Sequence, residues 1–307
     1  ALGADPVVVN GAPVLNWCTA DRIGNMRYGA SGLWIIEADE SDKSLLKYHP
    51  DWAVITNISR DHFDLAETTE LFKTFSNQVG KGIVSHMEQP DMFESFSPRI
   101  SVAGSRFIHR GIEFVVPLPG RHNAENALCA VMMCERLGYQ PGRISGALRM
   151  FKGIQRRLEL VGQAGGVTVI DDYGHNPAKI KAAWQAMAQA HGRVVGVWRP
   201  HGYRPLASMM EELVGTFKEV CRATDRLFVL PVYDAGGTAD RSVKSQTLVE
   251  RLRDESICAS YLPDADGMTD EIAGAADSGD VVLVMGARDP HLPELARRIL
   301  QSIGKKI

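Results

Sequence analysis

Short apolar runs alternate with longer amphipathic stretches along most of this chain. Continuous runs such as Val-Val-Gly-Val-Trp at residues 194–198 are typical of strands buried on both faces of a parallel sheet. The longer stretches between them predict helical crossovers. The predicted strands are residues 7–9, 33–36, 53–57, 167–170, 194–198, 227–230 and 281–285, and the predicted helices are residues 70–79, 123–137, 180–191, 206–223, 245–253 and 292–302.

Two further features divide the pattern. Residues 107–108 and 114–116 are apolar and flank His109-Arg110-Gly111, which predicts a hairpin. A domain boundary is expected near Gly153, giving one domain over residues 1–153 and another over residues 154–307. Since strands and helices alternate again after the boundary, the second domain is predicted to be a doubly wound α/β sheet.

Composition narrows the class of protein. The 307 residues are 45% hydrophobic and 23% charged with a net charge of −3, which gives no basic surplus for nucleic acid. No apolar run approaches the roughly 18 residues of a membrane span, and no signal peptide is expected in this sequence. The five cysteines include no Cys-x-x-Cys pair, so we expect reduced thiols in a cytoplasmic protein.

Two polar clusters follow predicted strands in the first domain. Glu37-Ala38-Asp39-Glu40-Ser41-Asp42 could hold a hard cation such as Mg²⁺, which prefers oxygen ligands, or could be a solvated acidic turn. Asn57 and His62 lie in the polar segment after the next strand. His62 could bind a metal or orient a phosphate, although an ordinary loop histidine is the commoner case.

Two more clusters combine functional side chains. Gly120-Arg121-His122-Asn123, with Asn126, opens a helix, where free N–H groups favour polar or anionic ligands or simply an N-cap. Asp171-Asp172-Tyr173-Gly174-His175 follows a strand, at the sheet edge where open α/β folds bind ligands. The remaining basic candidates are Arg156, Arg157, His201 and Arg204, which could bind phosphate or carboxylate or be surface charges.

The order and spacing of these clusters are more specific than any single one. Glu37-Ala38-Asp39-Glu40-Ser41 comes first, followed by Thr56-Asn57-Ile58 with Asp61-His62, Gly120-Arg121-His122-Asn123 with Asn126, Arg156-Arg157, and Asp171-Asp172-Tyr173-Gly174-His175. In this order they resemble the Mur ligase family, over essentially the whole chain. Within the family the likeness is greatest to the members that join L-alanine to UDP-N-acetylmuramate.

The resemblance implies an incomplete central domain of the P-loop ATPase type over residues 1–153. A Rossmann-like, amino-acid-binding C-terminal domain would follow over residues 154–307. It also implies ATP and Mg²⁺, a UDP-N-acetylmuramate-type nucleotide sugar and an amino acid as ligands. The reaction would activate a carboxylate as an acyl phosphate, which an amine then attacks in peptidoglycan precursor synthesis.

The resemblance also implies a role for each candidate residue. Glu37 and His62 would be metal ligands, and the catalytic residues would be His62, Arg157 and His175. The remaining implied contacts are with ATP at Asn57, His122, Asn123, Asn126, Arg156, Arg157 and Asp172, and with substrate at Tyr173, His175, His201 and Arg204.

Two departures from the family pattern matter. The alanine-adding members usually carry Pro-His-Arg-Tyr-Ser/Thr-Arg, where this chain has Pro200-His201-Gly202-Tyr203-Arg204-Pro205. The family's N-terminal domain and its phosphate loop have no match here, since only Gly80-Lys81-Gly82 approaches G-x-x-x-x-G-K-[ST]. We therefore expect the sequence to begin just past that loop, and the 307 residues alone to show no ligase activity.

Two alternatives stay open at this stage. The chain could belong to a murein-peptide ligase or another Mur-like ligase, which the departure at Gly202 favours. It could instead be a non-catalytic binding module on the same fold. Glu37, His62 and Arg157 argue for an enzyme, because a binding module has no need of metal-ligand and phosphate-binding residues.

Overall fold

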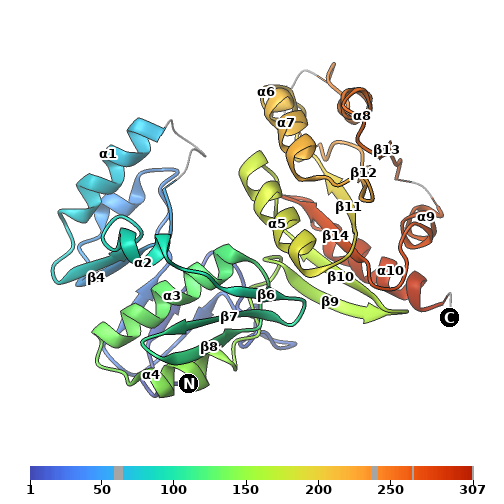
Figure 1. Cartoon of the computed structure of the whole chain (residues 1–307). Helices are drawn as coiled ribbons and strands as arrows, with labels where there is room; N and C mark the ends of the chain where they lie inside the picture. The colour runs from blue at the N-terminus through green and yellow to red at the C-terminus, as the bar shows by residue number, and fades with distance from the viewer. Residues whose placement is uncertain (59–64, 235, 237–240, 265, 306–307) are drawn as a thin grey trace. The chain divides into compact units, whose positions relative to one another are not determined.

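The computed structural model describes all residues except 59–64, 235, 237–240, 265 and 306–307. The chain divides into two compact units (Figure 1). The first comprises residues 1–99 and 103–153, and the second comprises residues 154–307 together with 100–102.

The first unit contains several small sheets. Strand β1 (Val7–Val9) pairs antiparallel with β2 (Met26–Arg27) and parallel with β3 (Trp34–Ile36). A separate parallel pair joins β4 (Trp52–Ile55) to β5 (Gly82–Ser85). The 3₁₀ helix η1 (Ser44–Lys47) and helix α1 (Leu65–Ser76) lie between these strands in sequence, and both contribute to a small core with β4.

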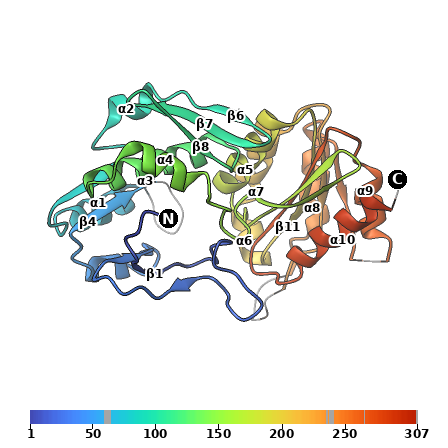
Figure 2. The same cartoon turned by 90° about the horizontal axis from the view of Figure 1, so that it is seen from below.

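The other half of the first unit is an antiparallel sheet backed by helices. Strands β7 (Gly104–His109) and β8 (Ile112–Val116) pair antiparallel, and the order of the sheet is β6-β7-β8, although of β6 (Arg99–Ser101) only Arg99 is counted in the first unit. Helix α3 (Arg121–Arg136) contacts β7, β4 and β5, while α4 (Pro141–Leu148) contacts β8 (Figure 2). The short helix α2 (Pro90–Glu94) adds Phe93 to the apolar core that these elements share.

The second unit is built on one six-stranded sheet. Its order is β13-β12-β11-β14-β10-β9, in which only β9 is antiparallel to its neighbour. Strands β10 and β14 are buried at every residue, which explains their continuous apolar sequences. The strands are β9 (Glu159–Ala164), β10 (Val167–Asp172), β11 (Val194–Arg199), β12 (Arg226–Val229), β13 (Ala259–Tyr261) and β14 (Val281–Gly286).

Helices cover both faces of this sheet (Figure 1). On one face, α5 (Pro177–Ala190), α7 (Met210–Val220) and α8 (Ser245–Asp254) pack around the fully buried Trp184. On the other face, α9 (Met268–Gly274) and α10 (Leu292–Gly304) supply a second apolar layer. This is the doubly wound α/β arrangement that the sequence predicts.

The prediction of a single helix over residues 206–223 is wrong. The structure has α6 (Tyr203–Ser208) and α7 instead, separated by Met209, whose ψ of 7° leaves the helical conformation. Helix α6 begins earlier than predicted because Gly202, with φ +137°, turns the chain into it. The predicted hairpin around His109-Arg110-Gly111 is present as β7 and β8.

Candidate functional site

The carboxyl ends of three neighbouring strands form the candidate site of the second unit. Strand β14 lies between β10 and β11, with Met285 opposite Asp172 and Gly286 opposite Arg199. The segments that leave these strands therefore start side by side. They carry Tyr173 and His175 after β10, His201 after β11 and Arg288 after β14.

Two histidines meet across the end of β14. The rings of His175 and His201 have centroids 4.8 Å apart, although their strands are not neighbours in the sheet. Tyr173 packs edge-on against His175 at 5.5 Å, and the His175 Nδ1 lies 3.0 Å from the Tyr173 carbonyl oxygen. Three sequence-predicted substrate residues thus form one aromatic cluster.

Positive charge surrounds His201. Burial, and to a lesser extent charge repulsion from His175, Arg288 and Lys179, together lower the pKa of its imidazole to about 4. The His201 ring is therefore neutral at pH 7 and can accept a hydrogen bond. An anion in this cluster would relieve the repulsion among its neighbours.

Asp172 holds the loop that precedes β9. Its Oδ2 accepts a hydrogen bond from the Leu158 N–H at 2.9 Å, and its Oδ1 accepts one from the Gly174 N–H at 2.7 Å. Burial raises the pKa of the Asp172 carboxyl, while these two bonds and Arg157 lower it. Both carboxylate oxygens already accept a hydrogen bond from this chain, so a ribose hydroxyl could bind only to their remaining lone pairs. The ribose contact of Asp172 stays a prediction.

Arg156 ties the same loop to the sheet. Its guanidinium contacts the Asp171 carboxylate at 3.3 Å, donates to the Gly286 carbonyl oxygen at 2.6 Å and lies over the Tyr173 ring. Burial raises the pKa of Asp171 to about 7, with Arg156 opposing the shift. Arg157 differs, because its side chain is exposed and its guanidinium lies over the Tyr173 ring, 5.8 Å from the ring centroid. Of the two predicted phosphate ligands, Arg157 has the more available guanidinium.

Arg199 forms ion pairs with two acidic side chains. Its guanidinium pairs with Asp264 and, at 3.1 Å, with the buried Asp289. Arg204, which the sequence predicts to bind substrate, is exposed near the start of α6. Arg288 and Lys179 were missed by the sequence reasoning. The signal for Arg288 was available, since Ala287-Arg288 follows a buried strand in the same way as Tyr173 and His201.

The first unit places Glu37 directly after β3. Its Oε2 accepts a hydrogen bond from the Gly11 N–H at 2.6 Å, which joins the ends of the parallel strands β1 and β3. The Glu37 side chain is exposed, so its other oxygen can reach a ligand. This suits Mg²⁺, which is usually held by one or two carboxylates together with waters and substrate phosphates.

The remaining candidates of the first unit lie at separate places. Asn57 follows β4, while His122, Asn123 and Asn126 lie in the first two turns of α3. The Asn123 amide donates to the Pro119 carbonyl oxygen at 2.7 Å, and Asn126 is exposed. His62 lies outside the described residues. Over the residues that are described, no three His, Cys, Asp or Glu side chains group as a metal site.

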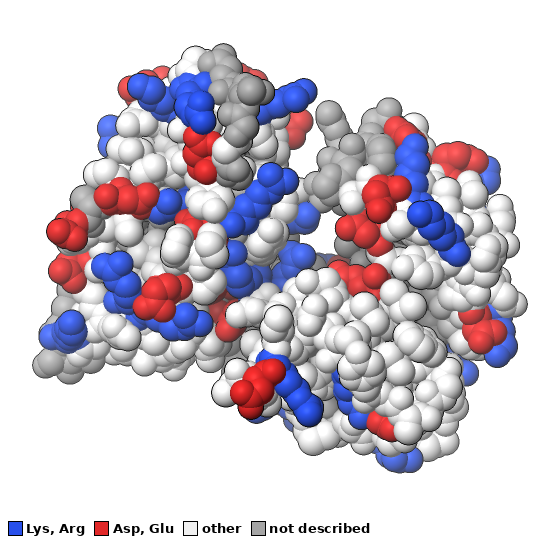
Figure 3. Space-filling view, turned by 180° about the vertical axis from the view of Figure 1, so that it is seen from behind, with Lys and Arg blue, Asp and Glu red and all other residues white. Residues whose placement is uncertain are grey.

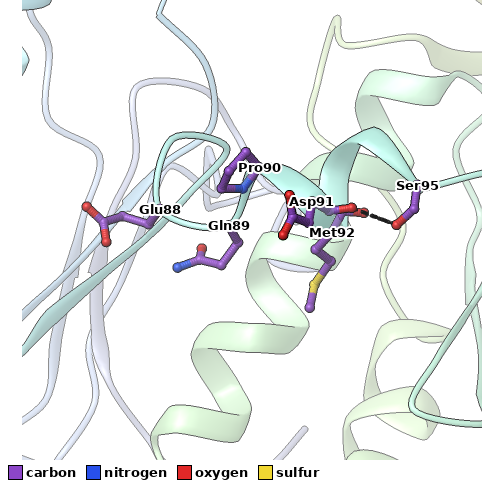
Figure 4. A pocket seen from close by; sticks show the side chains of 6 residues that line it. All are labelled: Glu88, Gln89, Pro90, Asp91, Met92 and Ser95. Carbon is purple, nitrogen blue, oxygen red and sulfur yellow. Dashed lines mark hydrogen bonds between the residues drawn. The ribbon is translucent and has the colours of Figure 1, made fainter.

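Other surface features do not add to these sites. A shallow hollow beside α2 contains none of the predicted residues (Figure 4). It is lined by Glu88, Gln89, Pro90, Asp91, Met92 and Ser95. Acidic and basic side chains are interspersed over the face in Figure 3. No helix in the described part of the chain is long and apolar enough to cross a membrane.

This chain matches known proteins both in sequence and in fold. Residues 156–288 match the family described as Mur ligase, glutamate ligase domain. A UDP-N-acetylmuramate–alanine ligase structure from Thermotoga maritima aligns with 99% of this chain and 70% of its own, with a TM-score of 0.75 at 20% identity. A MurF ligase from the same organism, in complex with ADP, aligns with 99% of this chain and 74% of its own, with a TM-score of 0.65 at 15% identity.

Sequence similarity goes further than the fold. A UDP-N-acetylmuramate–L-alanine ligase of Rhizobium meliloti is 34% identical over 326 residues, which cover 93% of this chain and 67% of the relative. The Novosphingobium aromaticivorans protein of the same name is 31% identical over 94% of this chain and 68% of its own length. With this identity along nearly the whole chain, and with the strand-end cluster on the matching fold, the chain belongs to the Mur ligase family.

Proposed function

We propose that this chain carries the ATP-binding and amino-acid-binding parts of an ATP-dependent ligase. The enzyme would form an amide between the carboxylate of UDP-N-acetylmuramate and an amino acid, with L-alanine as the first candidate, and release ADP and phosphate. The observation that carries the proposal is the cluster at the ends of β10, β11 and β14, in a chain 31–34% identical to ligases of that name.

The chemical problem is electrostatic, because a carboxylate has to attack the γ-phosphorus of a polyphosphate. The substrate carboxylate oxygen forms a bond to phosphorus as the bond to ADP breaks, which gives an acyl phosphate. The amine then adds to the acyl carbon, loses a proton, and expels phosphate. Positioning and charge neutralisation supply most of the rate in such reactions.

In the first unit, we assign Glu37 to Mg²⁺, with His62 as the second proposed metal ligand. Bound Mg²⁺ would neutralise phosphate charge next to the ends of β1 and β3. The Gly11 N–H holds one Glu37 oxygen and leaves the other available to a ligand. Asn57, His122, Asn123 and Asn126 are proposed nucleotide contacts, and α3 provides the last three from one helix start.

In the second unit, the proposed substrate site is the aromatic cluster of Tyr173, His175 and His201. Its neutral His201 ring accepts a hydrogen bond from the incoming ammonium or amine. Arg157 is proposed to bind phosphate, and Asp172 and Arg156 hold the loop that carries it. Arg204 remains a proposed substrate contact.

The test is ADP release by the intact gene product, supplied with ATP, Mg²⁺, UDP-N-acetylmuramate and L-alanine. Release is expected only when all four are present. Glu37→Ala is expected to lower the rate at least about 100-fold, since it removes a metal ligand from the phosphate site. ADP release that ignores both the sugar nucleotide and the amino acid would contradict the proposal, and an unchanged rate in Glu37→Ala would contradict the metal assignment.

A peptide acceptor is the second candidate, and Gly202 favours it. The arginine of the family pattern is absent there, and a φ of +137° disfavours any side chain at this position. The smaller residue leaves more room beside His201 for a longer acceptor. L-Alanine and a murein tripeptide, offered separately at equal concentration, decide between the two by their kcat/KM values.

A further inference from the structure

Arg288 follows β14, the middle one of the three strands whose ends carry the cluster. Gly286 lies opposite Arg199 in the β11–β14 register, and Arg288 and His201 each come two residues after this pair. On the other side, Met285 lies opposite Asp172, and Arg288 and His175 each come three residues after that pair. The two histidine rings meet over the end of the strand that carries this arginine.

The arginines around Arg288 are already engaged. Arg199 pairs with Asp264 and Asp289, and Arg156 contacts Asp171 and the Gly286 carbonyl oxygen. Within the described part of the chain, the exposed Arg288 guanidinium makes no hydrogen bond and no ion pair. It therefore has its full set of donors available for a ligand.

The backbone at Arg288 is also unusual. Its φ is +63°, in the left-handed region that non-glycine residues seldom adopt. Gly286, two residues earlier, has no room for a side chain, because a Cβ there would lie 2.7 Å from Leu292 and 2.9 Å from the Arg199 carbonyl oxygen. Strained residues of this kind gather at ligand sites, where the surrounding fold holds them in place.

We propose that Arg288 is a specificity-determining residue of the acceptor site, and that it binds an anionic oxygen group directly beside His175 and His201. This rests on the proposed function, and names the group within the site that selects the acceptor. Gly202 carries no guanidinium where the family pattern has an arginine, and Arg288 supplies one from the end of the neighbouring strand β14. A guanidinium fork matches the two oxygens of a carboxylate or of a phosphate.

The carboxylate of the acceptor and the phosphate released in the reaction are the two sources of such a group. Asp289 does not oppose either, because its carboxylate is buried against Arg199. Lys179, in the first turn of α5, adds a second positive charge, and this charge also lowers the pKa of His201.

The test is binding to the 307-residue chain, followed through the imidazole proton resonances of His175 and His201 by NMR. The probes are L-alanine, L-alaninamide, which lacks the carboxylate, and inorganic phosphate. Arg288→Asn removes the charge and keeps a residue that tolerates positive φ. We expect it to weaken L-alanine binding roughly 10- to 100-fold, and Arg288→Lys to weaken it less.

Arg110→Asn is the matched control, because Arg110 also has positive φ, at +49°, but lies in the β7–β8 turn of the other unit. It should leave every affinity unchanged, and thermal denaturation shows whether each variant is folded. Loss of phosphate binding alone in Arg288→Asn supports the anion site with phosphate as its occupant. Unchanged binding of both L-alanine and phosphate by folded Arg288→Asn overturns the proposal.

Because this readout needs no turnover, it separates the two proposals. A chain that binds L-alanine through Arg288 but belongs to a protein without ligase activity contradicts only the proposed function. Full ligation with an unaltered KM for L-alanine in Arg288→Asn contradicts only the role of Arg288.

Discussion

The two units present parallel strands in opposite environments. In the second unit, β10 and β14 are buried at every residue between two layers of helices. In the first unit, all three residues of β3 are exposed, and the Trp34 side chain is 62% accessible. Both strands β10 and β3 nevertheless lead into carboxylates that the sequence marks as functional, Asp172 and Glu37.

The carboxylates at the ends of these two strands differ in burial and in the hydrogen bonds that they accept. Asp172 is buried and accepts two backbone N–H groups, so it positions the loop that carries Arg157. Glu37 is exposed and accepts one, so its second oxygen is available to a ligand. The carboxylate that holds a loop and the one proposed to bind a ligand thus differ in burial, although both come at the end of a strand.

The largest expected effect compares two tryptophans. Trp184 is fully buried and donates to Asp225 through its indole N–H, whereas Trp34 lies on the exposed β3. Trp184→Ala is expected to destabilise its unit by about 3–5 kcal/mol, because it opens a cavity under the sheet. Trp34→Ala should cost less than about 1 kcal/mol. Chemical denaturation of both variants measures the difference.

Equal losses of unfolding free energy in Trp184→Ala and Trp34→Ala would contradict this comparison. That result would mean that β3 is covered in solution and that the two strand environments are alike. Trp184→Phe serves as the conservative control, since it keeps most of the buried volume and removes only the bond to Asp225.

The second prediction compares the two carboxylates. Asp172→Ala leaves the N–H groups of Leu158 and Gly174 without acceptors in a buried site, which we expect to cost about 2–5 kcal/mol. Glu37→Ala exposes the Gly11 N–H to water and should cost no more than about 0.5 kcal/mol. Urea midpoints of the two variants provide the measurement, and a larger loss for Glu37→Ala would reverse the roles assigned here.

The third and smallest effect is a pH dependence in the second unit. The folded pKa of Asp171 is about 7, above its ordinary value near 3.8, so the folded state holds the proton more tightly. The stability that this contributes is present below about pH 4 and is lost as pH rises through 7. Asp171→Asn should therefore gain about 1–2 kcal/mol relative to the parent chain between pH 5 and pH 8.

His201 is expected to give a pH dependence of stability opposite in direction to that of Asp171. Its folded pKa of about 4 lies below the ordinary value of 6.5, so its contribution is present above pH 6.5 and is lost as pH falls through 4. His201→Gln should flatten the acidic limb of the stability profile and leave the limb between pH 6.5 and 8 unaltered. An Asp171→Asn profile parallel to that of the parent chain would show that Asp171 is ionised throughout.

The sequence predicted the second unit better than the first, for a physical reason. Strands buried on both faces, such as residues 194–198 and 281–285, give long apolar runs that mark both the element and its place in the sheet. Short or edge strands such as β2, β9 and β13 carry mixed sequences, since water covers part of them, and they were not predicted. The division of residues 203–220 into α6 and α7 depends on Gly202 and Met209, which no periodicity indicates.

The candidate site was predicted only in part. Residue type and position after a strand were enough to suggest Tyr173, His175 and His201, which the structure brings into one cluster. Arg288 also follows a buried strand and has the same sequence signal. Lys179 has no such signal, because it lies in helix α5 rather than directly after a strand. The opposite behaviour of the neighbours Arg156 and Arg157 depends on tertiary contacts, namely Asp171 and Gly286, that sequence spacing does not encode.

The position of β14 in the sheet has a consequence for how the chain folds. It is the last strand in the sequence, yet it lies between β10 and β11, and its pairing joins Asp172 to Met285. During synthesis the sheet of the second unit therefore cannot close until residues 281–286 have left the ribosome. Contacts between such distant segments form slowly and leave apolar edges exposed in the meantime. The ligand site, which is assembled across this strand, would be among the last features of the unit to appear.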